Sequence, residues 1–259
     1  MKLTRSKSRV LAIKTIYLQN PSNTSFKKRR KSKTERQKDH LMRYKFYREH
    51  KYVSHCLNAL ERLIAKTDFT IPEEVKHVQG EFDNLKHMLE GHAQYENDCL
   101  HILLTKKQSL VPEHILSEHQ NLDKECDVIQ AKINAISASA TQEEKIEAGY
   151  QLYIWYRKFV GENLVHLHEE ETLILPELQR LYTDDELRAV EGSIYNHMSA
   201  EQLTHMMEEL FPHMNPSDRI VFLDDIKVCD PVKFQAAWKG IQSKIAPKER
   251  ADIIKKLSI

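Results

Sequence analysis

Histidine and carboxylate residues recur together at one spacing along the chain. In three places a carboxylate follows a histidine by four residues: His92 and Glu96, His119 and Asp123, His166 and Glu170. Residues four apart are neighbours on the surface of a helix, so each pair can present an imidazole nitrogen and a carboxylate oxygen to the same ion. Such mixed ligation suits iron or manganese better than a thiolate site would. The spacing therefore predicts a metal centre held between helices.

A further histidine, His50, occupies the same kind of position on an earlier segment, where the apolar pattern calls for Leu or Ile. Burying such groups without a cation would cost several kcal/mol for each unpaired charge, and a bound metal removes that cost. The donors exceed the needs of one ion, so we expect a pair of ions bridged by carboxylates such as Glu96 and Glu170. The predicted metal ligands are His50, His92, Glu96, His119, Asp123, His166 and Glu170. Other histidines are interpreted as hydrogen-bonded or solvated residues: His55, His77, His87, His101, His114 and His168.

The segments that carry these residues have an apolar period of about 3.6, which is the period of a helix. Four long amphipathic helices are expected: one over about 38–66, and three that begin at Pro72, near Pro112 and at Thr141. Pro is favoured in the first turn of a helix, and Thr141 with Glu144 has the spacing of a capping box. Four such helices joined by short links predict an up-down-up-down four-helix bundle over 38–183. Shorter helical segments follow, so 184–259 is predicted to be a helical C-terminal extension.

The composition favours an all-α protein. The chain of 259 residues holds only 6 Gly and 8 Pro, which is too little turn chemistry for a many-stranded β fold. Its 4 Cys include no Cys-x-x-Cys pair, which argues against a disulfide or zinc framework and for a reducing compartment. No run of about 18 apolar residues is present, so no transmembrane helix is predicted. We expect a cytoplasmic protein that is monomeric rather than oligomeric.

Positive charge is concentrated at the start of the chain, although the formal net charge is only +1. Residues 1–40 contain 13 Lys and Arg against 2 acidic residues, which leaves 26 basic and 36 acidic residues in the remainder. A segment so polar cannot bury enough apolar surface to fold, so 1–37 is expected to be a flexible, disordered basic arm. Three roles stay open: a solubilising extension, an organelle transit peptide, or a weak contact of 1–36 with nucleic acid, another polyanion or an anionic membrane.

The order of the candidate ligands resembles that of a known family. The lone His50, then His92-x-x-x-Glu96, Glu118-His119 and His166-x-x-x-Glu170 within HLHEEETLILPEL, are similar to the haemerythrin-like (HHE cation-binding) domain over about 40–185. Members are up-down-up-down four-helix bundles with a non-haem di-iron centre. The resemblance implies a pair of iron ions, with O₂ or NO as the small ligand, and roles in iron or oxygen sensing or in oxidative and nitrosative stress. The ligand positions it implies are His50, His92, Glu96, His119, His166 and Glu170.

Two positions differ from the oxygen-carrying members of that family. Asp123 stands where they supply a second histidine from the third helix. Glu171, beside the better-spaced Glu170, stands where they supply Asp five residues after the last histidine. A site richer in carboxylates should favour oxidation of iron over reversible release of O₂. We therefore expect a metal- and oxygen-binding module that binds or senses O₂, NO or iron, rather than a simple oxygen carrier.

Two other functions stay open. The first is an enzyme with the same iron centre: a di-iron oxidase, an NO scavenger or a protein that repairs iron centres. The second is a metal-free helical interaction protein whose basic arm binds nucleic acid. A further polar stripe is either solvated or one face of a second metal site; its members are His197, Glu201, His205 and Glu209.

Overall fold

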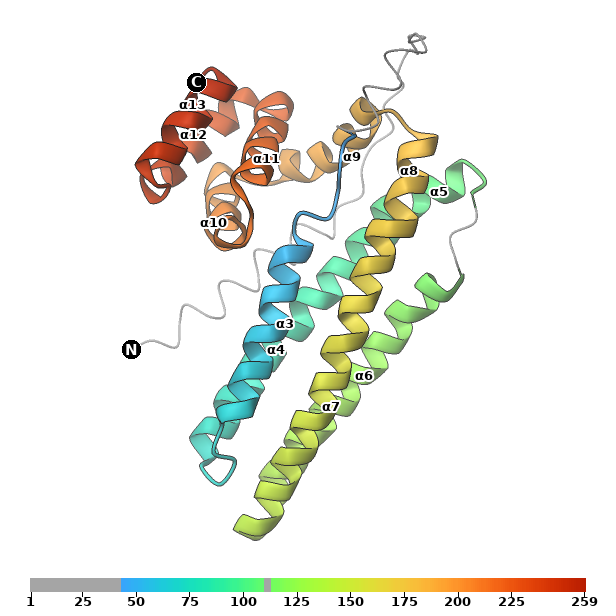
Figure 1. Ribbon diagram of the computed structural model, residues 1–259, viewed down its shortest axis with the longest axis vertical. Coiled ribbons are helices and arrows are strands. Elements are labelled where there is room, and N and C mark those ends of the chain that lie inside the picture. Colours follow the sequence, from blue (N-terminus) through green and yellow to red (C-terminus); the bar gives the residue numbers. More distant parts are fainter. Residues whose placement is uncertain (1–42, 110–112) are drawn as a thin grey trace. The chain divides into compact units, whose positions relative to one another are not determined.

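The computed structural model describes residues 43–109 and 113–259, and every regular element in these ranges is a helix (Figure 1). The all-α class is therefore confirmed for the described residues, whereas the predicted arm, 1–37, lies outside them. The α-helices are α3 (His50–Lys66), α4 (Pro72–Tyr95), α5 (Ile102–Lys106), α6 (Glu113–Ala138), α7 (Gln142–Glu169), α8 (Leu175–Leu181), α9 (Asp184–His197), α10 (Ala200–Leu210), α11 (Pro216–Cys229), α12 (Pro231–Ile241) and α13 (Pro247–Leu257). Between some of them lie the π-helical segments η1 (Glu96–His101) and η2 (Glu170–Ile174) and the 3-10 segments η3 (Phe211–His213) and η4 (Gln242–Lys244).

The described chain divides into two compact units. The first unit is Val53–Ile174, and the second unit joins residues 43–52 to Leu175–Ile259. The predicted extension began at residue 184, whereas this division falls after Ile174. The first unit holds the long helices α4, α6 and α7 and the part of α3 from Val53 onward, and these helices run alongside one another (Figure 1).

The core of the first unit comes from one face of each long helix. Leu57 of α3, Phe82 of α4, Ile129 of α6 and Tyr156 of α7 are all completely buried. Burial of a large apolar side chain stabilises a fold by about 1.5–3 kcal/mol. The Tyr156 hydroxyl donates a hydrogen bond of 3.0 Å to the carbonyl oxygen of Leu57, so this buried polar group is satisfied. The apolar residues that recur about every 3.6 positions in the sequence thus mark the helix faces that form this core.

The ends of the helices depend on local residues. Thr141 accepts a hydrogen bond from the backbone N–H of Glu144, and the Glu144 side chain accepts one in return, so the predicted capping box is confirmed. The first helix begins at His50, and the prediction of helix over the described residues 43–49 was wrong. Tyr47 has a φ of 68°, a left-handed conformation that a right-handed helix cannot contain.

The second unit has a core of its own, to which α9 to α13 contribute. Leu203, Leu223 and Ile253 are completely buried in it. Four of its helices begin at a residue whose side-chain oxygen accepts a backbone N–H: Thr183, Ser199, Asn215 and Asp230. Each such cap contributes about 1 kcal/mol, which helps to hold helices of 11 to 14 residues in place.

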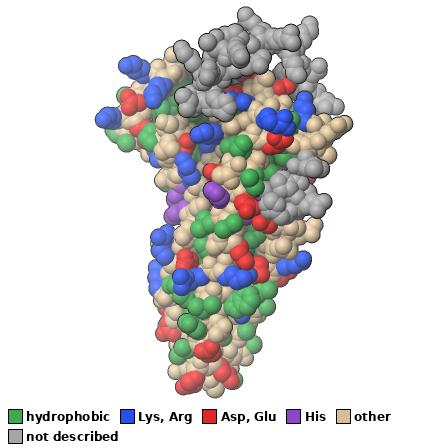
Figure 2. All heavy atoms as spheres, turned by 45° about the vertical axis from the view of Figure 1, so that its right-hand side comes forward, with side chains coloured by type: hydrophobic (Ala, Val, Ile, Leu, Met, Phe, Trp, Pro, Cys, Tyr) green, Lys and Arg blue, Asp and Glu red, His purple; other side chains and the backbone are tan. Residues whose placement is uncertain are grey.

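The surface is mixed in character. Lys and Arg side chains are interspersed with Asp and Glu over the face shown in Figure 2. Exposed apolar side chains also occur, and on α7 Ile146, Tyr150 and Ile154 follow one another at four-residue intervals. Among the described residues, no helix combines the length and the apolar character needed to cross a membrane.

A cluster of charged side chains is buried in the second unit. The Tyr44 hydroxyl oxygen lies within hydrogen-bonding distance of the carboxylates of Glu191 and Asp225, at 2.8 Å from the latter. Arg48 Nη1 lies 3.5 Å from Asp225 Oδ2 and 3.8 Å from Glu191 Oε2. Arg188 Nε lies 2.9 Å from Asp225 Oδ1. When both carboxylates are ionised the two guanidinium groups balance them, and the Arg188 side chain, 32% exposed, connects the cluster to the surface.

The stability of the second unit is expected to fall as the pH rises from about 4.5 to about 7. Burial raises the pKa of Glu191 from 4.5 to about 7, and the nearby Arg48 only partly opposes this rise. Between these pH values the folded chain keeps a proton on Glu191 that the unfolded chain has lost, so a rise in pH favours unfolding. Burial also raises the pKa of Asp225, which acts in the same direction.

Urea unfolding at several pH values measures this slope. A Trp155→Phe background leaves Trp238 of α12 as the only tryptophan, so its fluorescence reports the second unit. Glu191→Gln should flatten the slope, whereas Glu201→Gln, at an exposed carboxylate of α10, should leave it unchanged. A slope of the opposite sign would contradict the prediction.

Candidate metal centre

Five of the predicted ligands lie together inside the first unit. His92 lies in the last turn of α4, and Glu96 is the first residue of η1. His119 lies on α6, and His166 of α7 precedes Glu170, the first residue of η2. Both carboxylates are completely buried, and each of these histidines is at most 6% exposed. Carboxylates are almost never buried to this extent unless an opposite charge compensates them.

One group of ligand atoms, all within 4.8 Å of one another, comes from Glu96, His119, His166 and Glu170. His119 Nε2 lies 3.5 Å from Glu96 Oε2 and 3.6 Å from Glu170 Oε1. His166 Nε2 lies 2.9 Å from His119 Nε2 and 3.4 Å from Glu170 Oε1. Adjacent ligands of a metal with bonds of about 2.1 Å are separated by about 3.0–3.4 Å. The four distances, 2.9–3.6 Å, are close to this range, so the four side chains could surround one ion.

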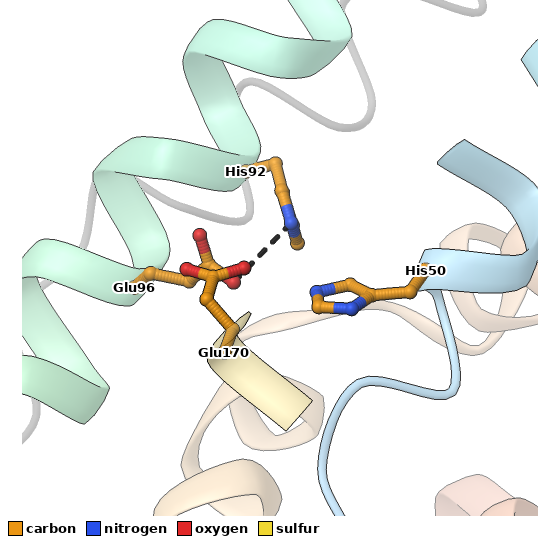
Figure 3. A group of neighbouring side chains, drawn as sticks. All are labelled: His50, His92, Glu96 and Glu170. Atoms are coloured by element: carbon orange, nitrogen blue, oxygen red, sulfur yellow. Dashed lines mark ion pairs between the residues drawn. The ribbon is translucent and has the colours of Figure 1, made fainter. Parts of the chain in front are cut away.

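A second group of ligand atoms within the same limit of 4.8 Å includes His92, Glu96 and Glu170, all of the first unit (Figure 3). His92 Nε2 lies 3.2 Å from Glu96 Oε1. The remaining predicted ligand, His50, is the buried first residue of α3 and belongs to the second unit. The two groups share Glu96 and Glu170. A carboxylate has two oxygens and can bind one ion through each, so the shared pair has the arrangement that bridging ligands require.

The two shared carboxylates have the same local backbone. Glu96 and Glu170 each follow a histidine by four residues, and each begins a π-helical segment, η1 and η2. A π-helical turn holds an extra residue, is rare, and is frequent at functional sites. A π-helical segment begins at each of the two predicted bridging residues, which indicates that this backbone conformation positions their carboxylates.

The electrostatics of the group favour a cation. Burial disfavours a charge on His119, but the carboxylates of Glu170 and Glu96 outweigh burial and raise the pKa of His119 to about 9. At neutral pH a positive charge is therefore favoured beside them, either as a proton on His119 or as a metal ion that displaces this proton.

Two residues outside the predicted ligand set contact Nδ1 of His119 and of His166, the ring nitrogen opposite the one that could bind a metal. His166 Nδ1 lies 2.9 Å from Glu118 Oε2, and His119 Nδ1 lies 3.2 Å from Asn97 Oδ1. Oxygen acceptors at Nδ1 leave Nε2 of both imidazoles as the nitrogen that can bind a metal. Sequence reasoning did not identify these roles, because such contacts join different helices and have no fixed spacing.

Asp123 is placed differently from the other predicted ligands. Its side chain is exposed, and it belongs to neither group of ligand atoms. It lines a cavity of about 30 Å³ together with His92, His119 and His166. Most of the remaining lining is apolar: Leu89, Ala93, Leu122, Cys126 and Leu167. One water needs about 10–15 Å³ by the same measure, so the cavity can hold a diatomic molecule.

The polar stripe of the second unit does not resemble this centre. His205 Nε2 lies 3.7 Å from Glu209 Oε1, but in the part of the chain that the structure describes the stripe forms no cluster of three possible ligands. The two groups around Glu96 and Glu170 are thus the candidate metal centre. Comparison of the chain with family models, curated proteins and solved structures found no match.

Proposed function

We propose that the chain is a haemerythrin-like protein in which α3, α4, α6 and α7 form an up-down-up-down four-helix bundle around a non-haem di-iron centre. The observation that carries this proposal is the pair of completely buried carboxylates, Glu96 and Glu170, shared by two groups of possible ligands. Imidazole and carboxylate ligands without thiolates suit iron or manganese. The order of the ligands along the chain supports iron, because it resembles the order in haemerythrin-like domains.

The protein binds or senses O₂ or NO at this centre. The apolar cavity beside His92, His119 and His166 supports this function, because a volume of about 30 Å³ is enough for a diatomic molecule. Bound iron would supply the redox chemistry and the affinity for a diatomic ligand that the side chains lack. The side chains would hold the ions, and the apolar part of the cavity wall suits an uncharged gas molecule.

An enzyme that consumes O₂, peroxide or NO is the second candidate. Asp123 favours it, because an exposed carboxylate lines the same cavity. Such a group can pass protons from solvent to a ligand that is being reduced, which turnover requires and simple binding does not. Catalytic consumption of NO that slows in Asp123→Asn, at an unchanged iron content, would identify the enzyme.

Iron analysis after anaerobic reconstitution tests the proposal. We expect about two iron ions per chain, since the two groups share their carboxylates. Exposure to air should produce the near-ultraviolet absorption of an oxo-bridged iron pair, and NO should bind the reduced protein. A chain that binds no iron, or that retains a single zinc ion in its place, would overturn the di-iron assignment and support the metal-free interaction protein or a zinc site.

A further inference from the structure

Asn97 connects a predicted ligand to a buried histidine outside the ligand set. Its Oδ1 lies 3.2 Å from His119 Nδ1 and 3.2 Å from His101 Nδ1. The rings of His101 and His119 are nearly parallel, with 5.6 Å between centroids and 17° between planes. All three residues belong to the first unit, and Asn97 and His101 lie on η1, whose first residue is Glu96.

A metal can bind His119 Nε2 only when the hydrogen of the neutral ring is on Nδ1. The neighbour of Nδ1 therefore decides whether this imidazole can serve as a ligand. An amide presents an acceptor at one end and a donor at the other. If Asn97 turned its NH₂ group toward His119, it would donate to Nδ1, and the ring hydrogen would move to Nε2 and block the metal.

His101 decides which end of the amide faces the two rings. Its side chain is 3% exposed, and its Nε2 has no hydrogen-bond partner among the residues that the structure describes. A buried N–H without an acceptor is rarer in proteins than a buried lone pair without a donor. The His101 hydrogen is therefore favoured on Nδ1, where it is donated to the Asn97 amide oxygen.

We infer that Asn97, oriented by His101, is a positioning residue that keeps His119 in the tautomer able to bind metal. This inference rests on the proposed metal centre. It gives the buried His101 a role that the ligand pattern alone does not, because His101 acts through Asn97 and does not touch the ion. It also accounts for the η1 turn, which places Asn97 beside Glu96 and within reach of both imidazoles.

A rescue experiment separates this role from simple packing. Asn97→Leu removes the acceptor, and we expect its zinc affinity to fall about 10–100-fold, the usual cost of losing such a contact. His101→Phe keeps a buried ring but has no N–H, so the amide is free to turn and the affinity should also fall. Adding Asn97→Asp to His101→Phe should restore affinity, because a carboxylate presents oxygen in either orientation. Asp98→Asn, on the same segment, is the matched control and should behave like wild type.

Zinc(II) serves as a diamagnetic probe in place of iron, with affinity measured by competition with a chelator. Imidazole ¹⁵N NMR of the zinc-loaded protein should place the His119 hydrogen on Nδ1 in wild type. Unchanged affinity in Asn97→Leu, or no rescue of His101→Phe by Asn97→Asp, would overturn the inference and leave the metal centre standing. A wild-type chain that binds neither zinc nor iron would overturn both.

Discussion

Glu96→Gln is expected to reduce the iron content from about two ions per chain to almost none, because both groups of ligand atoms depend on this residue. The amide of Gln has nearly the shape of the carboxylate but lacks its charge and one of its two ligating oxygens. Glu170→Gln should have the same effect. His166→Ala removes a ligand from only one group, so about one ion should remain.

Glu96→Gln lowers the iron content, but it should not lower the stability of the metal-free protein. Without iron, Glu96 and Glu170 are two completely buried carboxylates in one cluster, and repulsion between them destabilises the fold. Glu96→Gln removes that repulsion, so we expect an unfolding free energy equal to or above that of metal-free wild type. With iron present, the order should reverse, because only the wild type gains the free energy of binding.

Iron analysis together with urea unfolding, with and without a chelator, measures both effects. Glu171→Gln is the matched control, because this exposed neighbour of Glu170 belongs to neither group. Retention of about one iron ion by Glu96→Gln would show that Glu96 serves a single ion and does not bridge.

The helical pattern could be predicted from the sequence because it depends on local residues. The apolar period gave the long helices, and the spacing of Thr141 and Glu144 gave the start of α7. The same reasoning failed at residues 43–49, where a left-handed Tyr47 interrupts the pattern. A positive φ at a bulky residue depends on tertiary packing, and no residue type signals it.

The candidate site could be predicted in part for the same reason. A spacing of four residues places His166 and Glu170 on one face, and the structure confirms that neighbourhood. The four-residue spacing does not determine which face of a helix packs into the core. Asp123, for example, has the right spacing from His119 but is exposed. Contacts such as Asn97 with His119 depend on how helices pack, so no pattern within one helix could have revealed them.

Iron is expected to raise the unfolding temperature of the first unit by about 10 °C or more. A ligand at a thousand times its dissociation constant stabilises the folded state by about 4 kcal/mol, and in a unit of this size each kcal/mol raises the midpoint by about 3–4 °C. The ligands of one group come from η1, α6, α7 and η2, so binding holds together elements that separate on unfolding.

The two tryptophans make the test specific to each unit. Trp155 lies on α7 in the first unit, and Trp238 lies on α12 in the second. With Trp238→Phe, the remaining Trp155 should report the large shift with iron(II) and its loss with a chelator. With Trp155→Phe, Trp238 should report a smaller shift, because the core around it contains none of the ligands. Equal shifts at both probes would mean that the units unfold as one, and no shift at Trp155 would contradict metal binding in the first unit.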